Sequence, residues 1–227
     1  MNVLISGASG LLGTALRAVL SSSGHQVTRL VRKSGGTEPD EAFWNPATGD
    51  MDRDALKGVD AVVHLAGEGI GDSRWTAAKK RRILESRVNG TRLLAEALAR
   101  LAPPSITFLS ASAIGCYGSR GDEILTEESS LGSDFLADVC RDWEGATKPA
   151  SDAGVRVARL RLGIVLSRDG GALGKMLAPF KLGLGGPIGG GRQWMSWIGI
   201  NDAVGAICHA LRDERIQGAV NLVAPNP

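Results

Sequence analysis

The chain has 227 residues, 22% of them charged, and a formal net charge of +2 at pH 7, so charge gives no reason to expect nucleic acid or an anionic membrane as a partner. This length is enough to bury a full core, in one domain or one and a half. The three cysteines are scattered, the three histidines lie far apart, and no apolar run is long enough to span a bilayer, so we expect a cytoplasmic protein without disulfides or metal.

Short apolar runs alternate along the chain with longer segments of helical periodicity, which is typical of βαβ units and a parallel sheet. The first strand starts at once, so no signal peptide is expected. Strands are predicted near residues 2–6, 26–31, 60–66, 105–111, 155–162 and 219–223. Helices are predicted near residues 11–22, 75–101, 133–148 and 202–212. The glycine-rich segment 163–200 breaks the alternation and is expected to form loops.

The segment that joins the first strand to the first helix reads Gly7-Ala8-Ser9-Gly10-Leu11-Leu12-Gly13. Glycines at this spacing are typical of a turn whose amides bind the pyrophosphate of a dinucleotide. The first permits the tight turn, the second lets the backbone approach the phosphates, and the third lets the helix pack on the strand. A tight turn into a packed helix is the alternative, but the flanking strand and amphipathic helix favour a cofactor site. We expect contacts from Gly7, Ser9, Gly10, Leu11, Leu12 and Gly13.

The end of the second strand distinguishes NAD from NADP, because NAD sites usually carry an acidic residue there and an arginine suits the 2′-phosphate of NADP. This strand is followed by Arg32 and Lys33, without a carboxylate. Both side chains can be ordinary solvated residues, but their distance from the glycines predicts NADP(H) as the cofactor.

The third strand ends in small residues that suit a close approach of the cofactor. Contacts are expected from His64, Leu65, Ala66 and Gly67, with His64 packed in the strand rather than catalytic. The basic run Lys79-Lys80-Arg81-Arg82 on the following helix is interpreted as a solvated face rather than a nucleic-acid patch.

Together these features predict an α/β fold of the Rossmann type, with a doubly wound parallel sheet and a small lobe on the substrate side. We expect the NADP-binding core in residues 1–162 and the substrate-side loops and lobe in 163–200. Residues 201–227 are expected to form a late helix and a strand that return to the core.

Several motifs resemble the extended short-chain dehydrogenase/reductase family. They are the glycine run, Gly24-His25-x-Val27, His64-Leu65-Ala66-Gly67, Val88-Asn89-Gly90-Thr91 and the segment from Ser112 to Tyr117-Gly118. Others are similar to an atypical branch of that family, the YfcH-like epimerase family proteins, over the whole length of the chain. These are Ser86-Arg87-Val88, Gly185-Gly186-Pro187-Ile188-Gly189, Gly191-Arg-Gln-Trp-Met-Ser-Trp-Ile198 and Asn221-Leu-Val-Ala-Pro-Asn-Pro227. Because such proteins usually continue beyond the last motif, the substrate-side lobe is expected to be truncated here.

The resemblance implies catalysis by a serine and by a tyrosine with a lysine four residues later, which lowers the pKa of the phenol. Ser112 matches the family's serine, although a plain strand-end serine is the alternative. The helix expected to carry the tyrosine and lysine, residues 135–144, contains neither, and Arg87 stands where relatives carry an asparagine. The chain's single tyrosine, Tyr117, is the remaining candidate, with a structural role in the turn as its alternative.

The expected substrate side departs from the family as well. Sugar-nucleotide enzymes of the family often carry an arginine where this chain has Met195. Arg192 can supply the charge instead, and Trp194 and Trp197 can either stack on a flat ligand or pack the lobe.

Two functions remain open from the sequence. The first is an NADP(H)-dependent oxidoreductase or epimerase that acts on a carbonyl or sugar-nucleotide-like small molecule. The alternative is a non-catalytic NADPH-binding protein that works as a sensor or assembly partner. The sequence does not determine the substrate or the oligomeric state.

Overall fold

A mostly parallel sheet forms the centre of the molecule. The structure is a computed structural model, and it describes residues 1–32, 38–101, 106–187 and 190–227. Eight strands follow the order β10-β7-β6-β5-β1-β2-β3-β4, with bounds β1 Asn2–Ser6, β2 Gln26–Val31, β3 Glu41–Asn45, β4 Asp50–Met51, β5 Ala61–His64, β6 Thr107–Ala113, β7 Arg156–Leu162 and β10 Gly218–Leu222. Every pairing is parallel except that of β3 with β4. The chain order reverses between β1 and β5, which is the position where doubly wound sheets bind ligands.

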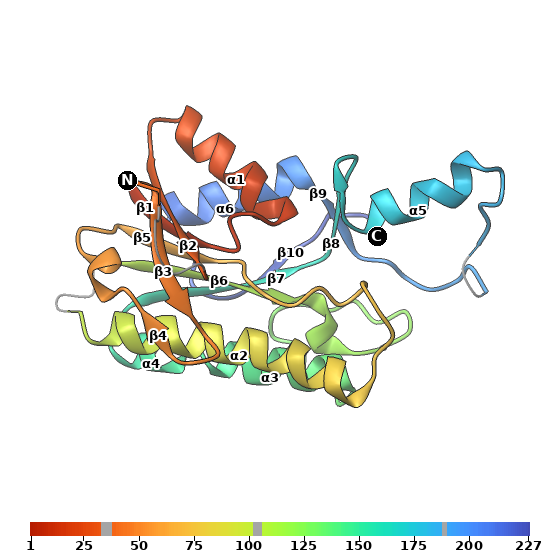
Figure 1. Cartoon of the computed structure of the whole chain (residues 1–227). Helices are drawn as coiled ribbons and strands as arrows, with labels where there is room; N and C mark the ends of the chain where they lie inside the picture. The colour runs from red at the N-terminus through yellow and green to blue at the C-terminus, as the bar shows by residue number, and fades with distance from the viewer. Residues whose placement is uncertain (33–37, 102–105, 188–189) are drawn as a thin grey trace.

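Helices cover both faces of this sheet (Figure 1). One face carries α1 (Leu11–Ser22) and α6 (Ile200–Arg212), and the other carries α2 (Ala77–Ala99), α3 (Phe135–Gly145) and α4 (Lys148–Asp152). Two short 3-10 helices, η1 (Arg53–Leu56) and η2 (Ile114–Tyr117), lie in the connections. None of the helices that the structure describes is long and apolar enough to cross a membrane.

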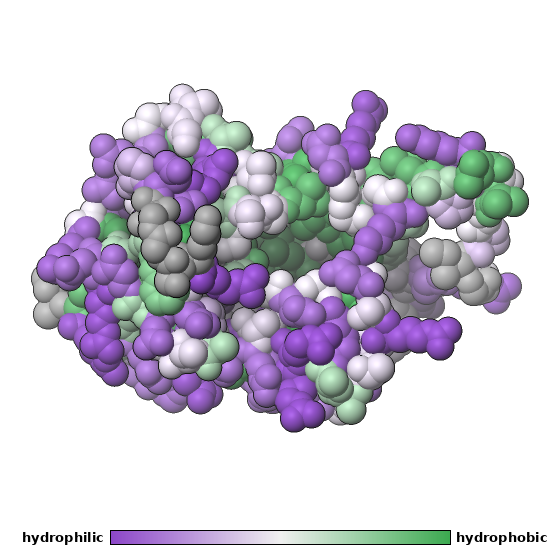
Figure 2. All heavy atoms as spheres, viewed as in Figure 1, coloured by the Kyte–Doolittle hydropathy of each residue, from purple (hydrophilic) through white to green (hydrophobic). Residues whose placement is uncertain are grey.

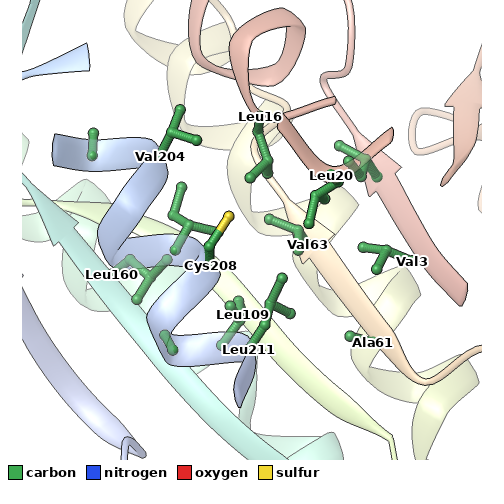
Figure 3. Close-up of a cluster of buried hydrophobic side chains, with 14 of the residues drawn as sticks. Val3, Leu16, Leu20, Ala61, Val63, Leu109, Leu160, Val204, Cys208 and Leu211 are labelled. Carbon is green, nitrogen blue, oxygen red and sulfur yellow. The ribbon is translucent and has the colours of Figure 1, made fainter. Parts of the chain in front are cut away.

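The core on the α1 side explains why these helices form where they do. Leu16 and Leu20 recur at helical spacing and are buried, and they meet Cys208 of α6 over the sheet (Figure 3). Full burial of one leucine side chain stabilises the fold by about 1.5–3 kcal/mol. On the opposite face, α2 buries Leu94 and Leu98 in a second cluster. The predicted Rossmann-type sheet is therefore confirmed, with hydrophobic layers on both faces.

Residues 163–200, expected to form substrate-side loops and a lobe, contain regular elements that the sequence prediction lacks. This segment contains a two-stranded parallel sheet of β8 (Ile164–Ser167) and β9 (Trp197–Gly199), and the helix α5 (Gly171–Lys181) between them. The helix extends away from the body of the molecule and buries none of its residues (Figure 1). The end of this helix shows a hydrophobic surface in Figure 2. Phe180, in its last turn, is 58% exposed. The sequence prediction missed this helix because glycines flank it and Pro179 lies within it.

Other differences are local. The short strands β3 and β4 are absent from the sequence prediction, and β3 reaches the core through Ala42 and Trp44. The helix expected over 133–148 ends at Gly145, and α4 follows separately with Pro149 in its first turn, where proline is tolerated.

Candidate functional site

In the glycine turn after β1, the positions of Gly7 and Gly13 have no space for a side chain. Gly7 has a φ of +72°, and a Cβ there would lie 2.7 Å from the backbone nitrogen of Ala66. A Cβ on Gly13 would collide with the carbonyl oxygen of Gly7 and lie 2.8 Å from the Cα of Ala8. Gly10, in contrast, is exposed and donates its backbone N–H to the Gly7 carbonyl over 3.0 Å. Gly7 is thus packed against the residues that follow β5, Gly13 is packed against the turn itself, and Gly10 faces solvent.

Helix α1 begins at this turn with its N-terminal amides free. Its N-cap is Gly10, no side chain caps it, and its first turn has no acidic residue. The bond from Thr14 N–H to the Gly10 carbonyl, 2.8 Å long, is the first of the helix. The amides of residues 11–13 therefore have no acceptor within the helix, and the helix dipole adds positive potential. This arrangement suits a phosphate group.

Arg32 follows the last residue of β2 directly, at the same edge of the sheet as the glycine turn. Its side chain is exposed, and in the part of the chain that the structure describes it forms no ion pair. Arg29, by contrast, is occupied by Asp40 and Glu41 at 2.8 and 3.0 Å. Lys33, the other basic residue expected here, lies outside the described residues. Among the basic residues described at this strand end, Arg32 is available to a ligand.

The end of β5 contributes backbone rather than side chains. Leu65 donates its N–H to the Ser6 carbonyl over 3.1 Å, so the chain continues beside β1 as far as Ala66, which contacts Gly7. Gly67 is exposed. These residues form one wall of the glycine turn.

The expected contact from His64 needs correction. The imidazole is fully buried, with Ser6 Oγ bonded to its Nδ1 and Trp44 against its ring at 5.8 Å between centroids. Burial and then the charge of Arg87 lower its pKa to about 3, so the ring stays neutral. His64 therefore supports the core, as a packed strand residue, and its ring is not a cofactor ligand.

The basic run on α2 also differs from expectation at its first residue. Lys79 is 4% exposed and donates to Glu68 Oε1 over 2.7 Å, whereas Lys80, Arg81 and Arg82 are exposed as predicted. The hydrogen bond from Lys79 holds the pKa of the Glu68 carboxyl below its usual value against the effect of burial. The pair ties the start of α2 to the loop after β5.

Ser112 lies at the end of β6 in a buried polar network. Its hydroxyl donates to Glu144 Oε1 over 2.7 Å, and the same carboxylate accepts from Arg161 Nε at 2.8 Å and Nη2 at 2.9 Å. The three residues are 2%, 7% and 5% exposed. Burial alone would raise the pKa of Glu144, but the bonds from Arg161 and Ser112 outweigh it and lower the pKa. Glu144 is therefore a carboxylate at neutral pH.

Tyr117 belongs to this network through its hydroxyl. It accepts from Arg161 Nη1 over 2.9 Å and donates to Asn221 Oδ1 over 2.7 Å. Burial raises the pKa of the phenol, which outweighs the lowering by Arg161 and Asn221. The structure thus brings Ser112 and Tyr117 together, through Glu144 and Arg161.

The sequence reading missed Glu144, Arg161 and Asn221. Each lies on a different element, α3, β7 and β10, and only their packing makes one network of them. The sequence does contain a signal for Arg161. β7 carries arginines among apolar residues, and it pairs with a strand on each side. A charge in such a strand requires a buried partner.

The residues expected on the substrate side differ in their surroundings. Arg192 is exposed. Trp194 is 61% exposed, and its Nε1 donates to Asp122 Oδ1 over 2.7 Å. Trp197 begins β9 and is half-buried. Trp194 therefore connects this segment to the loop after η2, while Trp197 packs within the small sheet.

Figure 2 shows the face between the two helical layers as a hollow with hydrophobic side chains inside it, at the side of the molecule where α1 begins. The glycine turn, the free α1 amides and the reversal of strand order at β1 and β5 lie together at the carboxyl edge of the sheet. This combination defines a dinucleotide-binding protein of the Rossmann class.

The sequence comparison identifies the family. The pattern of the NAD dependent epimerase/dehydratase family matches residues 3–222, and the chain belongs to this family as an atypical, epimerase-type short-chain dehydrogenase/reductase. Epimerase family protein ML0860 of Mycobacterium leprae is 42% identical over 225 residues, which are 99% of this chain and 72% of that protein.

Two solved structures share the fold over the whole chain. The nucleoside-diphosphate sugar epimerase from Corynebacterium glutamicum has a TM-score of 0.89 and 48% identity, and this chain covers 47% of it. Human epimerase family protein SDR39U1 (isoform 2), crystallised with NADPH, has a TM-score of 0.88 and 38% identity, with 75% of that chain covered. The chain thus spans less than half of the first protein and three quarters of the second.

Proposed function

We propose that this protein binds NADP(H) and acts as an oxidoreductase or epimerase-like enzyme on a small molecule with a carbonyl or sugar-nucleotide-like structure. The observation that carries the proposal is the glycine turn, because a Cβ at Gly7 or Gly13 would clash with backbone while Gly10 stays open. These residues fit a bound pyrophosphate. The cofactor assignment agrees with the NADPH in the structure of human SDR39U1.

Selection of NADP(H) over NAD(H) is assigned to Arg32. Its guanidinium stands exposed after β2, where the ribose of the adenine half lies in this fold, and it offers a planar fork for a 2′-phosphate. No carboxylate among residues 26–32 competes for this position or favours the free ribose hydroxyls of NAD.

The residues around Ser112 would position the reacting group of the substrate. The nicotinamide, when bound, supplies or accepts a hydride. The Ser112 hydroxyl has one proton and donates it to Glu144, so toward a ligand its oxygen acts as an acceptor, for example from a substrate hydroxyl. To polarise a carbonyl instead, this hydroxyl has to turn away from Glu144. Arg161 holds the Glu144 carboxylate through two of its nitrogens and thereby fixes the orientation of the Ser112 hydroxyl.

Tyr117 suits the role of a proton donor rather than a base, because its raised pKa keeps the phenol protonated at neutral pH. Its hydroxyl is already bonded to Arg161 and Asn221, so a water molecule at Ser112 is the competing donor.

A second function, an NADPH-binding sensor or assembly protein without turnover, is favoured by one observation. The family resemblance places a tyrosine and a lysine on α3, but the face of α3 that meets β6 carries Cys140 and Glu144 instead. Cys140 Sγ lies 3.7 Å from the Ala113 carbonyl oxygen. Burial raises the pKa of the Cys140 thiol to about 11, so it does not supply an ionised group.

Two measurements test the proposal. Dissociation constants of NADPH and NADH should be measured for the wild type and Arg32→Ala. The wild type should bind NADPH more tightly than NADH. Arg32→Ala should lose this preference, because its affinity for NADPH falls while its affinity for NADH stays unchanged. Equal wild-type affinities would contradict the cofactor assignment.

Oxidation of NADPH should then be followed with carbonyls and sugar nucleotides, using Ser112→Ala and Tyr117→Phe. Tight binding without turnover would favour the sensor, and an unchanged rate in Tyr117→Phe would remove that residue from the mechanism.

A further inference from the structure

A partly buried arginine lies beside the nicotinamide half of the expected cofactor site. Arg87 belongs to α2, and its Nη1 donates to the carbonyls of Glu68 at 3.0 Å and Ile83 at 3.1 Å. The guanidinium stacks on the ring of Trp143, 5.1 Å from its centroid. A Cβ on the exposed Gly67 would lie 3.3 Å from the guanidinium carbon. The cation is therefore held directly behind the open end of β5.

The sheet and α3 connect this cation to the network of Ser112. His64 of β5 pairs with Ser110 of β6, so the residues that follow β5 run beside the last residues of β6. Trp143, on which Arg87 stacks, precedes Glu144, the partner of Ser112. In a doubly wound sheet one half binds the adenine nucleotide and the other binds the nicotinamide nucleotide. Arg32 marks the adenine half on β2, so β5 and β6 carry the nicotinamide half.

Among the described residues Arg87 forms no ion pair; the charge of Glu68 attracts it, but that carboxylate and Glu144 are each bound to other cations. Glu68 binds Lys79 and Arg82, and Glu144 binds Arg161. His64 is neutral. The two nitrogens Nε and Nη2 of Arg87 donate to no described atom, since both of its hydrogen bonds use Nη1. A partly desolvated cation without an ion pair is costly, which makes Arg87 a candidate for a functional role.

We infer that Arg87 makes the site discriminate between the two redox states of the cofactor and bind NADPH more tightly than NADP⁺. The oxidised nicotinamide ring carries one positive charge that the reduced ring lacks, and all phosphate charges are the same in both. A fixed cation beside the ring therefore repels only the oxidised form. For charges several ångströms apart at a protein surface, this repulsion corresponds to about tenfold in affinity. The inference rests on the proposed function, because it requires the cofactor to bind in this orientation.

Dissociation constants of NADPH and NADP⁺ should be measured for the wild type, Arg87→Gln, Arg87→Lys and Arg32→Ala. The wild type should bind NADPH about tenfold more tightly, Arg87→Gln should lose most of this ratio, and Arg87→Lys should keep most of it. Arg32→Ala is the matched control, because loss of a cation on the adenine side weakens both forms equally and leaves the ratio unchanged.

The wild-type ratio needs no variant, so the inference stays testable even if Arg87→Gln fails to fold. Equal wild-type affinities for the two redox states, or an unchanged ratio in folded Arg87→Gln, would overturn the inference and leave the proposed function standing. Absence of binding by both forms would overturn the proposed function itself.

Discussion

The buried pair of Glu144 and Arg161 offers the sharpest test of the candidate site. Glu144→Gln keeps the shape of the side chain but removes the charge that two nitrogens of Arg161 and the Ser112 hydroxyl use, at 2.7–2.9 Å. Arg161 is only 5% exposed, so water cannot replace the carboxylate. Removal of one partner from such a pair costs about 3–5 kcal/mol, because a buried charge is left uncompensated.

Urea unfolding at pH 7 measures this loss, and the melting temperature should fall by about 10 °C, at roughly 2–4 °C per kcal/mol for a chain of this size. Asp138→Asn is the control, because it breaks the exposed pair with Arg141 on the same helix and should cost about 0–1 kcal/mol. The double variant Glu144→Leu with Arg161→Met should lose less than the sum of the single variants. A loss below about 1 kcal/mol for Glu144→Gln would refute the view that Arg161 depends on this carboxylate.

Two further predictions concern pH and the glycine turn. Because the pKa of Glu144 is lowered in the folded state, its stabilisation is present above the ordinary value of 4.5 and is lost as pH falls below it. Unfolding titrations from pH 7 to 3 should thus show the gap between wild type and Glu144→Gln narrowing, and a constant gap would contradict the ion pair. Gly13→Ala should abolish NADPH binding and destabilise the fold by about 1–3 kcal/mol, because the new Cβ meets the Gly7 carbonyl. Gly205→Ala, at an open position of α6, should be neutral or stabilising by up to about 1 kcal/mol, and equal losses in the two variants would argue against a steric role for Gly13.

Local sequence signals predict much of the cofactor half of the molecule. The strands at 2–6 and 26–31 and the helix at 11–22 are confirmed residue for residue, because each is a complete periodic segment bounded by glycines or polar residues. The helix α5 was not predicted because it lies in a glycine-rich segment and contains Pro179, although its apolar residues recur at helical spacing.

The sequence by itself determined the Rossmann-type fold, the glycine turn and the cation after β2, since these depend on backbone geometry and on spacing between neighbours in the chain. It also determined that α3 lacks a tyrosine and a lysine. Only the tertiary structure decided that Ser112 donates to Glu144, that Arg161 connects this pair to Tyr117, and that Arg87 stands unpaired behind Gly67. Those relations join residues from separate elements, and the balance of charge and burial that sets their chemistry exists only after the elements pack.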